Sequence, residues 1–498
     1  MQQEQWGSRV GFILAAVGSA IGLGNIWRFP YMAFDNGGGA FLIPYFVALL
    51  TAGIPIIIME FALGHKMKGG GPLTFARINR KFEWIGWWQG IISFVIAVYY
   101  VVIIGWAINY IVFSFSLTWS GEPVDFFVGE FLALSDGPFD LGGIRRPILA
   151  AVVVTWGISF VALYAGVQEG IERANKVFMP LLIVMLLIIL VRGITLPGAA
   201  DGLELLFKPD FSQILDGGVW VAAYGQIFFT LSIAFAIMIT YSSYLPDDAD
   251  IVNNGFMTAL LNSGFSILAG IAIFSIVGYM MHLADGELPG DLSGVFLAFA
   301  TIPAAINELP TMSVLVGVLF FLALTFAGLS SFISINEVVV RAFVDKLNTP
   351  RKKVVVWYTI IAGLVSVIFT TGAGLYILDI VDYFINNFGI AIAGLVEVIV
   401  VGYLFRLSDL RDHANATSDF SIGSWWNIMI KVVTPVILGI SLILNFVENF
   451  SENYGGYATV EVVILGWLVA ALAVIIGFAV ARTKWPDETV LSGPDGRA

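Results

Sequence analysis

Two short runs of small and polar residues, 18–25 and 229–235, interrupt apolar stretches of the chain and are the parts best suited to bind a ligand. The first run contains three glycines, which weaken a helix and expose its backbone. Exposed carbonyl oxygens, together with the oxygens of Asn25, Thr230 and Ser232, suit an alkali cation. Neither run carries the His or clustered carboxylates that a transition metal requires. These runs therefore predict a site for a hard cation and for a ligand that binds backbone amides.

The composition shows what surrounds these runs. The chain has 498 residues, of which 58% are hydrophobic and only 12% are charged, whereas soluble domains average about 25% charged residues. With no Cys, disulfides, thiol catalysis and cysteine metal sites are excluded. The net charge of −12 argues against binding to nucleic acid. The solvent for most of this chain is therefore lipid, and at about 20 residues per crossing it has room for about a dozen spans.

Segments long and apolar enough to cross a membrane follow one another without a soluble appendage or linker. We therefore expect an all-α integral membrane protein with a single transporter-like domain, residues 1–498. The predicted spans are 10–34, 40–64, 86–117, 147–164, 170–192, 218–243, 254–282, 313–344, 353–370, 375–405, 425–449 and 457–481.

Basic residues predict the orientation of these spans, because cytoplasmic loops are enriched in Lys and Arg. They gather in the loops 65–85, 165–176, 345–353 and 405–424, which places both termini in the cytoplasm. The acidic run 246–250 falls on the same side and departs from this pattern. We expect the protein in the cytoplasmic (inner) membrane of a prokaryote.

The two interruptions lie at corresponding positions, about twelve residues into the first and the sixth span. Paired interruptions of this kind indicate a transporter built from inverted repeats. We expect the repeats to cover 10–192 and 218–405, with two extra helices at 425–481. Small residues that let helices pack closely are the alternative interpretation of the glycines.

Four motifs carry a family resemblance: the runs 18–30, 36–45, 226–232 and 327–331. They closely resemble those of the neurotransmitter:sodium symporter family, in its prokaryotic amino-acid transporter branch. The resemblance implies twelve transmembrane helices in a LeuT-like five-plus-five inverted repeat, with helices 1 and 6 unwound. It also implies sodium-coupled symport of an amino acid by alternating access.

The resemblance further implies two sodium sites. The first site would use the Ala20 carbonyl, Asn25, Thr230, Asn262 and the carboxylate of the substrate. The second would use three backbone carbonyls and two hydroxyls, from Gly18, Ile21, Ala327, Ser330 and Ser331. A substrate carboxylate that completes the first site would couple ion binding to substrate binding directly.

A substrate pocket beside the first site is implied in the same way. The amides of Leu23 and Gly24 and the Tyr100 hydroxyl would bind the substrate carboxylate, close to Ala20 and Gly22. The ammonium would meet Phe229, Thr230 and Ser232, and the side chain would contact Ile96, Phe235, Ser331 and Ile335.

Gates are expected on either side of that pocket. Tyr100 and Phe229 resemble an aromatic lid, and Arg28 with Asp382 resembles the ion pair of the outer gate. On the inner side Asp345 is in place, but Gln3 stands where relatives carry its Arg partner, so we expect Trp6 to help close this side. In the fifth span Gly170 and Pro180 have the spacing that the family uses to unwind that helix; a simple kink at the proline is the alternative.

One position, Gly22, determines the predicted substrate class. Family members that carry biogenic amines have Asp there, and without it an amine lacking its own carboxylate would leave the charges of the site unbalanced. The resemblance therefore favours an α-amino acid. Ile96 and Ala234 make the pocket smaller, so we expect neutral, hydrophobic amino acids such as alanine, valine or leucine.

Chloride is the last ligand that the resemblance suggests. Buried sodium ions need a compensating negative charge, and some relatives supply it with a Glu where this chain has Ser266. The neutral set here matches that of chloride-dependent members, and it consists of Tyr45, Gln226, Thr230, Asn262 and Ser266. The alternative is that a nearby carboxylate, such as Glu60, compensates and that Ser266 only packs.

Two carboxylates lie within predicted spans, Glu60 and Glu397, and such residues are expected to be functional. We expect Glu60 to accept hydrogen bonds from the backbone of an interrupted helix. Other classes of protein remain as alternatives. An intramembrane enzyme lacks a suitable nucleophile or His pair, and a channel lacks a filter-like repeat. An amino-acid sensor would keep the same sites but transport poorly, and the oligomeric state is not predicted.

Overall fold

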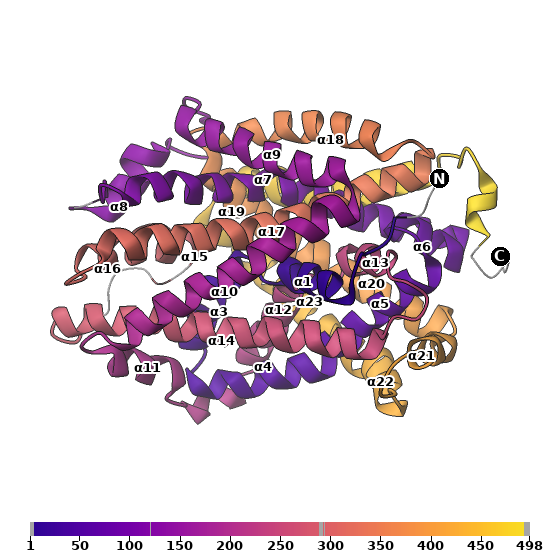
Figure 1. Cartoon of the computed structure of the whole chain (residues 1–498), viewed down its shortest axis with the longest axis horizontal. Coiled ribbons are helices and arrows are strands. Elements are labelled where there is room, and N and C mark those ends of the chain that lie inside the picture. The colour runs from indigo at the N-terminus through magenta and orange to yellow at the C-terminus, as the bar shows by residue number, and fades with distance from the viewer. Residues whose placement is uncertain (1–3, 120, 288–291, 293, 493–498) are drawn as a thin grey trace.

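The structure is a computed structural model that describes residues 4–119, 121–287, 292 and 294–492. Within these residues all regular elements are helices, and the only extended pairings are two isolated bridges, Gly38 with Pro209 and Ile144 with Thr371. The long helices run roughly parallel to one another along the long axis of the molecule (Figure 1). The described chain begins and ends at the same end of this bundle, close to α6 (Gly71–Ile78).

Ten helices in the described part of the chain are long and apolar enough to cross a membrane. Several contain π-helical turns, so one span often comprises more than one labelled element. The ten are Gly39–Met67 (η1, α4, η2, α5), Arg80–Ser114 (η3, α7), Arg146–Ala165 (α9), Val167–Ile194 (η5, α10), Ile251–Leu283 (α14), Ser313–Leu347 (α17), Arg351–Thr370 (α18, η8), Gly374–Leu404 (α19, η9, α20, η10), Ser424–Gly456 (α22, η11, α23, η12) and Thr459–Ala481 (α24, η13, α25).

The first and sixth predicted spans are not among these ten, because each is divided into shorter helices. In the first, α1 (Arg9–Ala20) is followed by α2 (Leu23–Ile26) and α3 (Arg28–Asp35). In the sixth, α12 (Gly217–Thr230) ends before residues 231–236, and α13 (Ile237–Ser242) follows. Both divisions fall within the runs of small and polar residues.

Shorter helices connect the spans. The loop between α14 and α17, where the sequence predicted no span, contains α15 (Gly294–Phe296), η7 (Leu297–Thr301) and α16 (Ile302–Asn307). The other connecting helices are α6 (Gly71–Ile78), α8 (Pro123–Asp125), η4 (Phe126–Leu132), α11 (Ala199–Phe207), η6 (Phe211–Leu215) and α21 (Leu407–Asn415), and η14 (Glu488–Leu491) follows the last span.

The core lies around the divided helices, while the later spans face outward. Half-helix α1 packs against α10, α14 and α17, and its residues Phe12, Ala15 and Ala16 are fully buried. In contrast, only 22% of the most apolar stretch of Ser424–Gly456 is buried inside the protein, and only 28% of the corresponding stretch of Thr459–Ala481. A wide apolar surface left exposed on such helices suits contact with lipid.

Candidate functional site

The interruption between α1 and α2 leaves the carboxyl end of α1 without a continuing helix. Gly22 adopts an extended conformation there, and its N–H donates to Asn25 Oδ1 at 2.9 Å. The last carbonyls of a helix lack partners within it and carry a partial negative charge. Among them, the Ser19 carbonyl accepts from Ser232 Oγ (2.9 Å) and from Ser331 Oγ (3.0 Å). The end of α1 is therefore an oxygen-rich point in the middle of the bundle.

The second interruption, residues 231–236, is held by side chains from neighbouring helices. Ser232, Ala234 and Ala236 have positive φ values of 53°, 69° and 64°, a conformation that costs non-glycine residues about 1–3 kcal/mol each. The Ala234 N–H donates to Glu60 Oε1 at 2.6 Å, and Ser93 Oγ donates to the Phe235 carbonyl at 3.1 Å. The prediction that Glu60 binds interrupted backbone is confirmed.

A second buried carboxylate, Glu397, lies in the same region of the core. Its Oε2 accepts from Gln89 Nε2 at 2.6 Å, and both residues have no exposed surface. Within the described residues, Glu397 Oε1, Glu60 Oε2 and Gln89 Oε1 are buried without a hydrogen-bond partner. The sequence marked Glu397 as functional but did not anticipate Gln89.

Both interruptions open onto one cavity of about 400 Å³. All twelve residues predicted to contact the substrate line it: Ala20, Gly22, Leu23, Gly24, Ile96, Tyr100, Phe229, Thr230, Ser232, Phe235, Ser331 and Ile335. The lining also includes residues that sequence reasoning missed, among them Ser19, Trp27, Tyr99, Asn386 and Tyr454. Tyr99 could have been anticipated as the neighbour of Tyr100, and Asn386 as the residue one helical turn beyond Asp382.

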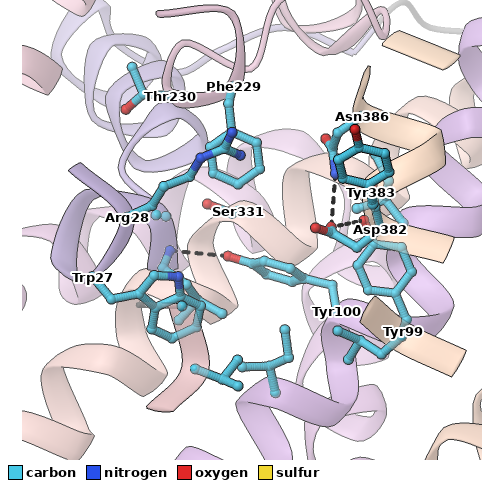
Figure 2. A pocket seen from close by; sticks show the side chains of 18 of the residues that line it. Trp27, Arg28, Tyr99, Tyr100, Phe229, Thr230, Ser331, Asp382, Tyr383 and Asn386 are labelled. Atoms are coloured by element: carbon cyan, nitrogen blue, oxygen red, sulfur yellow. Dashed lines mark hydrogen bonds between the residues drawn. The ribbon is translucent and has the colours of Figure 1, made fainter. Parts of the chain in front are cut away.

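One end of the cavity presents hydrogen-bond donors from two elements. The Leu23 N–H donates to the Tyr100 hydroxyl oxygen, 3.3 Å away, and a dashed line at the Tyr100 hydroxyl marks this bond in Figure 2. Gly22 lies beside them, since a Cβ there would be 3.2 Å from the Tyr100 hydroxyl and 3.1 Å from Ser331 Oγ. A backbone amide and a hydroxyl this close together can both donate to one carboxylate.

The predicted outer gate residues face each other across the cavity. The Arg28 guanidinium lies over the Phe229 ring, with 4.5 Å between Cζ and the ring centroid. Asp382 accepts from the Tyr99 hydroxyl (2.6 Å) and from Asn386 Nδ2 (2.8 Å) on the opposite wall. Figure 2 shows Arg28 and Asp382 on these two separate walls. The lining of the cavity continues past them to Asp379 and Tyr454.

Trp6, which is predicted to help close the inner side, is 7% exposed. Its Nε1–H donates to the Tyr241 carbonyl at 2.8 Å, and its N–H donates to the Tyr244 carbonyl at 3.2 Å. Asp345 binds Arg341 within its own helix (3.0 Å) and accepts from the Gly70 N–H (2.8 Å). Gln3, the other residue predicted here, lies outside the described residues.

The acidic run 246–250, which departs from the charge pattern of its side, has basic partners in the structure. Asp247 pairs with Lys68 at 2.9 Å, and Asp250 pairs with Arg9 at 3.2 Å. The hydrogen bond from Lys68 lowers the pKa of the Asp247 carboxyl. Asp250 also caps α14 by accepting from the Asn253 N–H. These carboxylates therefore neutralise basic residues at the same end of the bundle.

The predicted ligands of the first sodium site lie around the Asn25 side chain. Asn25 Nδ2 is 3.0 Å from Thr230 Oγ1 and 2.8 Å from Asn262 Oδ1. The structure thus brings Asn25, Thr230 and Asn262 together, and Ala20 ends the adjoining half-helix. In this arrangement the Thr230 and Asn262 oxygens meet at the Asn25 side-chain nitrogen, while Asn25 Oδ1 accepts from the Gly22 N–H. Neutral oxygens gathered at one buried point can replace the hydration shell of a cation.

The predicted ligands of the second site meet between α1 and α17. Ser331 Oγ lies 3.4 Å from the Gly18 carbonyl oxygen and 3.3 Å from that of Ile21. The preceding residue on α17, Ser330, donates from Oγ to the Ala327 carbonyl at 2.9 Å. The Ser19 carbonyl belongs to the same cluster, because it also accepts from Ser331 Oγ, but it was not among the predicted ligands.

The predicted chloride ligands lie close to the first sodium site, because the same Asn25 nitrogen contacts members of both sets. Asn25 Nδ2 is 2.8 Å from Ser266 Oγ, and the Tyr45 hydroxyl donates to Ser263 Oγ at 3.1 Å. Gln226 is fully buried, and neither its Oε1 nor its Nε2 has a hydrogen-bond partner in the described part of the chain. Buried polar atoms are almost always partnered, so the Nε2 donor of this amide is suited to a ligand that accepts hydrogen bonds.

Comparison with known proteins agrees with this geometry. The model of the sodium:neurotransmitter symporter family matches residues 3–122 and 118–487. An uncharacterized sodium-dependent transporter of Methanocaldococcus jannaschii is 44% identical over 97% of this chain and 98% of its own length. A sodium- and chloride-dependent glycine transporter 2 of Xenopus laevis is 30% identical, covering 94% of this chain and 68% of its own. A human sodium- and chloride-dependent GABA transporter 2 is also 30% identical, covering 95% and 85%.

Proposed function

Because this chain belongs to the sodium:neurotransmitter symporter family, we propose that it carries neutral, hydrophobic amino acids across a membrane together with sodium. The observation that carries this proposal is the meeting of both helix interruptions, with their backbone and hydroxyl oxygens, at one buried cavity. Sodium would bind to these oxygens at two points, and the substrate carboxylate would complete the first.

The amino-acid substrate is supported by the donors around Leu23. The Leu23 amide and the Tyr100 hydroxyl, 3.3 Å apart, would hold the substrate carboxylate close to Asn25. Gly22 adds no carboxylate of its own, so a negative charge has to arrive with the substrate. Among the relatives named above, one transports glycine and one GABA, and both of these substrates carry a carboxylate.

The size of the substrate is supported by the residues around the cavity. Ile96 and Phe235 contribute apolar surface beside Ile335. Ala234, which was expected to narrow the pocket, is fully buried against Gly394, its Cβ 2.9 Å from where a Cβ on Gly394 would lie. Apolar walls select for apolar side chains, with about 0.8 kcal/mol gained per buried methylene. We propose alanine, valine and leucine as the substrate group.

The two divided helices would be the first and sixth membrane spans. With the ten uninterrupted helices they would make twelve, arranged as two repeats over 10–192 and 218–405 and two further helices over 425–481. In this arrangement the end of the bundle with Trp6 would face the cytoplasm of a prokaryotic cell. Alternating access would open the cavity to this end and to the Tyr454 end in turn.

Transport is tested by reconstituting the purified protein in liposomes and measuring uptake of ³H-leucine and ³H-alanine. Uptake is expected to exceed the equilibrium level only with an inward sodium gradient, and leucine is expected to compete better than tryptophan in a scintillation proximity assay. Binding without gradient-driven accumulation would identify a sensor, and stronger binding of tryptophan would contradict the proposed substrate group.

Chloride would supply a compensating charge next to the first sodium site. The partnerless Gln226 amide, the Tyr45 hydroxyl and Ser266 Oγ are donors that could hold it. An anion at this point would offset the buried sodium ions, which otherwise carry an uncompensated charge in a low dielectric. This proposal agrees with the chloride dependence named for two of the relatives.

Replacing Ser266 by glutamate tests the chloride proposal. The introduced carboxylate would lie beside Asn25 and provide a fixed charge, so we expect Ser266→Glu to transport equally well in chloride and gluconate media. The unmodified protein is expected to lose about tenfold in uptake rate in gluconate, the equivalent of one hydrogen-bonded charge. Ser266→Gln, which has the same size without the charge, should remain dependent on chloride. Equal uptake by the unmodified protein in both media would contradict chloride dependence.

A further inference from the structure

A row of glycines brings the amino-terminal part of the chain unusually close to α10. A Cβ added to Gly11 would lie 2.1 Å from Glu172 Oε1, and one added to Gly18 would lie 2.5 Å from Asn175 Oδ1. On the segment just before α1, a Cβ on Gly7 would lie 2.5 Å from Gln168 Nε2. Any larger residue at these positions would separate the two elements. The glycines therefore let backbone of the α1 region rest directly on polar side chains of η5 and α10.

Glu172, at the end of η5 (Val167–Glu172), is the central side chain of this contact. It accepts from the Gly7 N–H at 2.6 Å through Oε2 and from the Ser8 hydroxyl at 2.8 Å through Oε1. Its side chain is only 2% exposed. Ser8 is itself the N-cap of α1, because its Oγ accepts from the Gly11 N–H at 3.0 Å. The carboxylate thus binds the cap of a helix that belongs to a different span.

This position favours a negative charge. The amino terminus of a helix carries a partial positive charge, and hydrogen bonds to an ionised acceptor are about twice as strong as neutral ones. Within the described chain, the first turn of α1 contains no acidic residue of its own. Glu172 therefore supplies from η5 the anion that α1 lacks.

The same carboxylate keeps a second partner that does not depend on α1. Lys176, one turn further along α10, donates from Nζ to Glu172 Oε1 at 2.6 Å, and the lysine side chain is 44% exposed. If α1 moved away, Glu172 would still be paired and would face the solvent that fills the gap. The contact can therefore break without leaving an unpaired buried charge, which would otherwise be costly.

The connections of α1 make such a movement feasible. Towards its carboxyl end α1 is joined to α2 only through residues 21–22, which have extended conformations. Towards its amino end it begins three residues after Trp6, which is proposed to close one end of the site. A short helix joined through non-helical backbone can move as one rigid unit.

We propose that Glu172, with Gly7 and Ser8, forms a latch that keeps α1 docked on α10 and so keeps the Trp6 end of the cavity closed. Glu172 is in this sense a positioning residue, since it touches no predicted substrate or ion ligand. The proposal rests on the proposed transport function, because only a protein that opens at both ends needs a reversible contact here. Lys176 competes for the carboxylate and thereby weakens the latch.

The latch is tested with reporter thiols in the full-length protein in nanodiscs, where the absence of native Cys leaves each introduced thiol alone. Ser334→Cys places one on α17 beneath Trp6, because Ser334 is fully buried and accepts from the Tyr241 hydroxyl at 2.7 Å. Leu378→Cys places another in the cavity lining on the far side. The measured quantity is the rate of modification by a charged methanethiosulfonate reagent.

In the Ser334→Cys protein, Glu172→Gln is expected to raise this rate about tenfold, and Ser8→Ala to raise it less, as the loss of hydrogen bonds to a charge predicts. In the Leu378→Cys protein the same changes should lower the rate, because opening one end closes the other. Lys176→Met should have the opposite effect on both thiols. Glu169→Gln is the matched control, since Glu169 lies on the same element, is 54% exposed and pairs with Arg173, and it should change neither rate.

A merely structural role for Glu172 would raise both rates together, and that result would overturn the proposal, as would unchanged rates in Glu172→Gln. If Glu172→Gln does not fold, the opposite responses of Ser8→Ala and Lys176→Met decide the matter. Failure of the proposed transport function would be recognised by a different result. The protein would then show no sodium-driven uptake in liposomes, independently of the rates of thiol modification.

Discussion

Replacing Gly22 by aspartate is expected to lower sodium-driven uptake of leucine by at least about 100-fold. The new Cβ would lie 3.2 Å from the Tyr100 hydroxyl and 3.1 Å from Ser331 Oγ, which is where the substrate carboxylate is proposed to bind. Two carboxylates at this distance in a buried site repel by several kcal/mol, enough for a loss of this size. Uptake is measured in proteoliposomes with ³H-leucine.

The same substitution should change which ligand binds. The introduced carboxylate can complete the first sodium site itself, so isoamylamine, which is leucine without its carboxylate, is expected to bind to Gly22→Asp and not to the unmodified protein. Gly22→Asn is the control, because its side chain has the same size and no charge. It should lose leucine binding without gaining the amine. If both variants lose leucine binding equally and Gly22→Asp does not bind the amine, the effect of position 22 would come only from the size of its side chain.

Replacing Asn25 by alanine is expected to abolish sodium-dependent binding, with a loss of at least about 100-fold in apparent sodium affinity. Asn25 is 1% exposed and bonds Gly22, Thr230, Asn262 and Ser266. Removing it takes away a proposed ligand and leaves several buried polar groups unpartnered, at about 1–3 kcal/mol each. Isothermal titration with sodium in the presence of a fixed leucine concentration measures the effect.

A loss of fold has to be separated from a loss of the ion site. Asn336→Ala is a suitable control, because Asn336 is also fully buried and bonds the Phe332 carbonyl and Tyr358, away from the cavity lining. It should lower thermal stability to a similar extent while sodium affinity stays within about threefold. Retained sodium affinity in Asn25→Ala would contradict the proposed first site.

The positions of the helix interruptions could be predicted from the sequence because their cause is local. Glycines at 18, 22 and 24 weaken the first span, and hydroxyl residues in 229–235 mark the second. A backbone that leaves a helix in an apolar setting needs partners, so a buried acceptor such as Glu60 could also be anticipated. The site residues followed from the family motifs, and the structure brings the twelve predicted substrate contacts to one cavity.

The parts that could not be predicted depend on which distant residues meet. Arg28 and Asp382 were predicted to pair with each other. In this structure Arg28 lies over Phe229 instead, and Asp382 accepts a hydrogen bond from Tyr99. The partner of Asp250 in the acidic loop is Arg9, which lies 241 positions away. The helices α15 and α16 lie in the loop between α14 and α17, whose apolar stretch, 295–306, is too short to be predicted as a span. Such facts come only from tertiary structure.

The closure at Trp6 has a consequence for inhibition. In this conformation the cavity lining extends to Asp379 and Tyr454, whereas Trp6, the residue proposed to close the other end, is packed against the rings of Tyr241 and Tyr244. A competitor too bulky to be carried, such as a leucine analogue with a large aryl extension, could enter only from the Tyr454 side. Inhibition should therefore depend on the side of the membrane to which the compound is added. It would inhibit uptake into vesicles in which the Tyr454 end faces the compound and leave uptake into inverted vesicles unchanged.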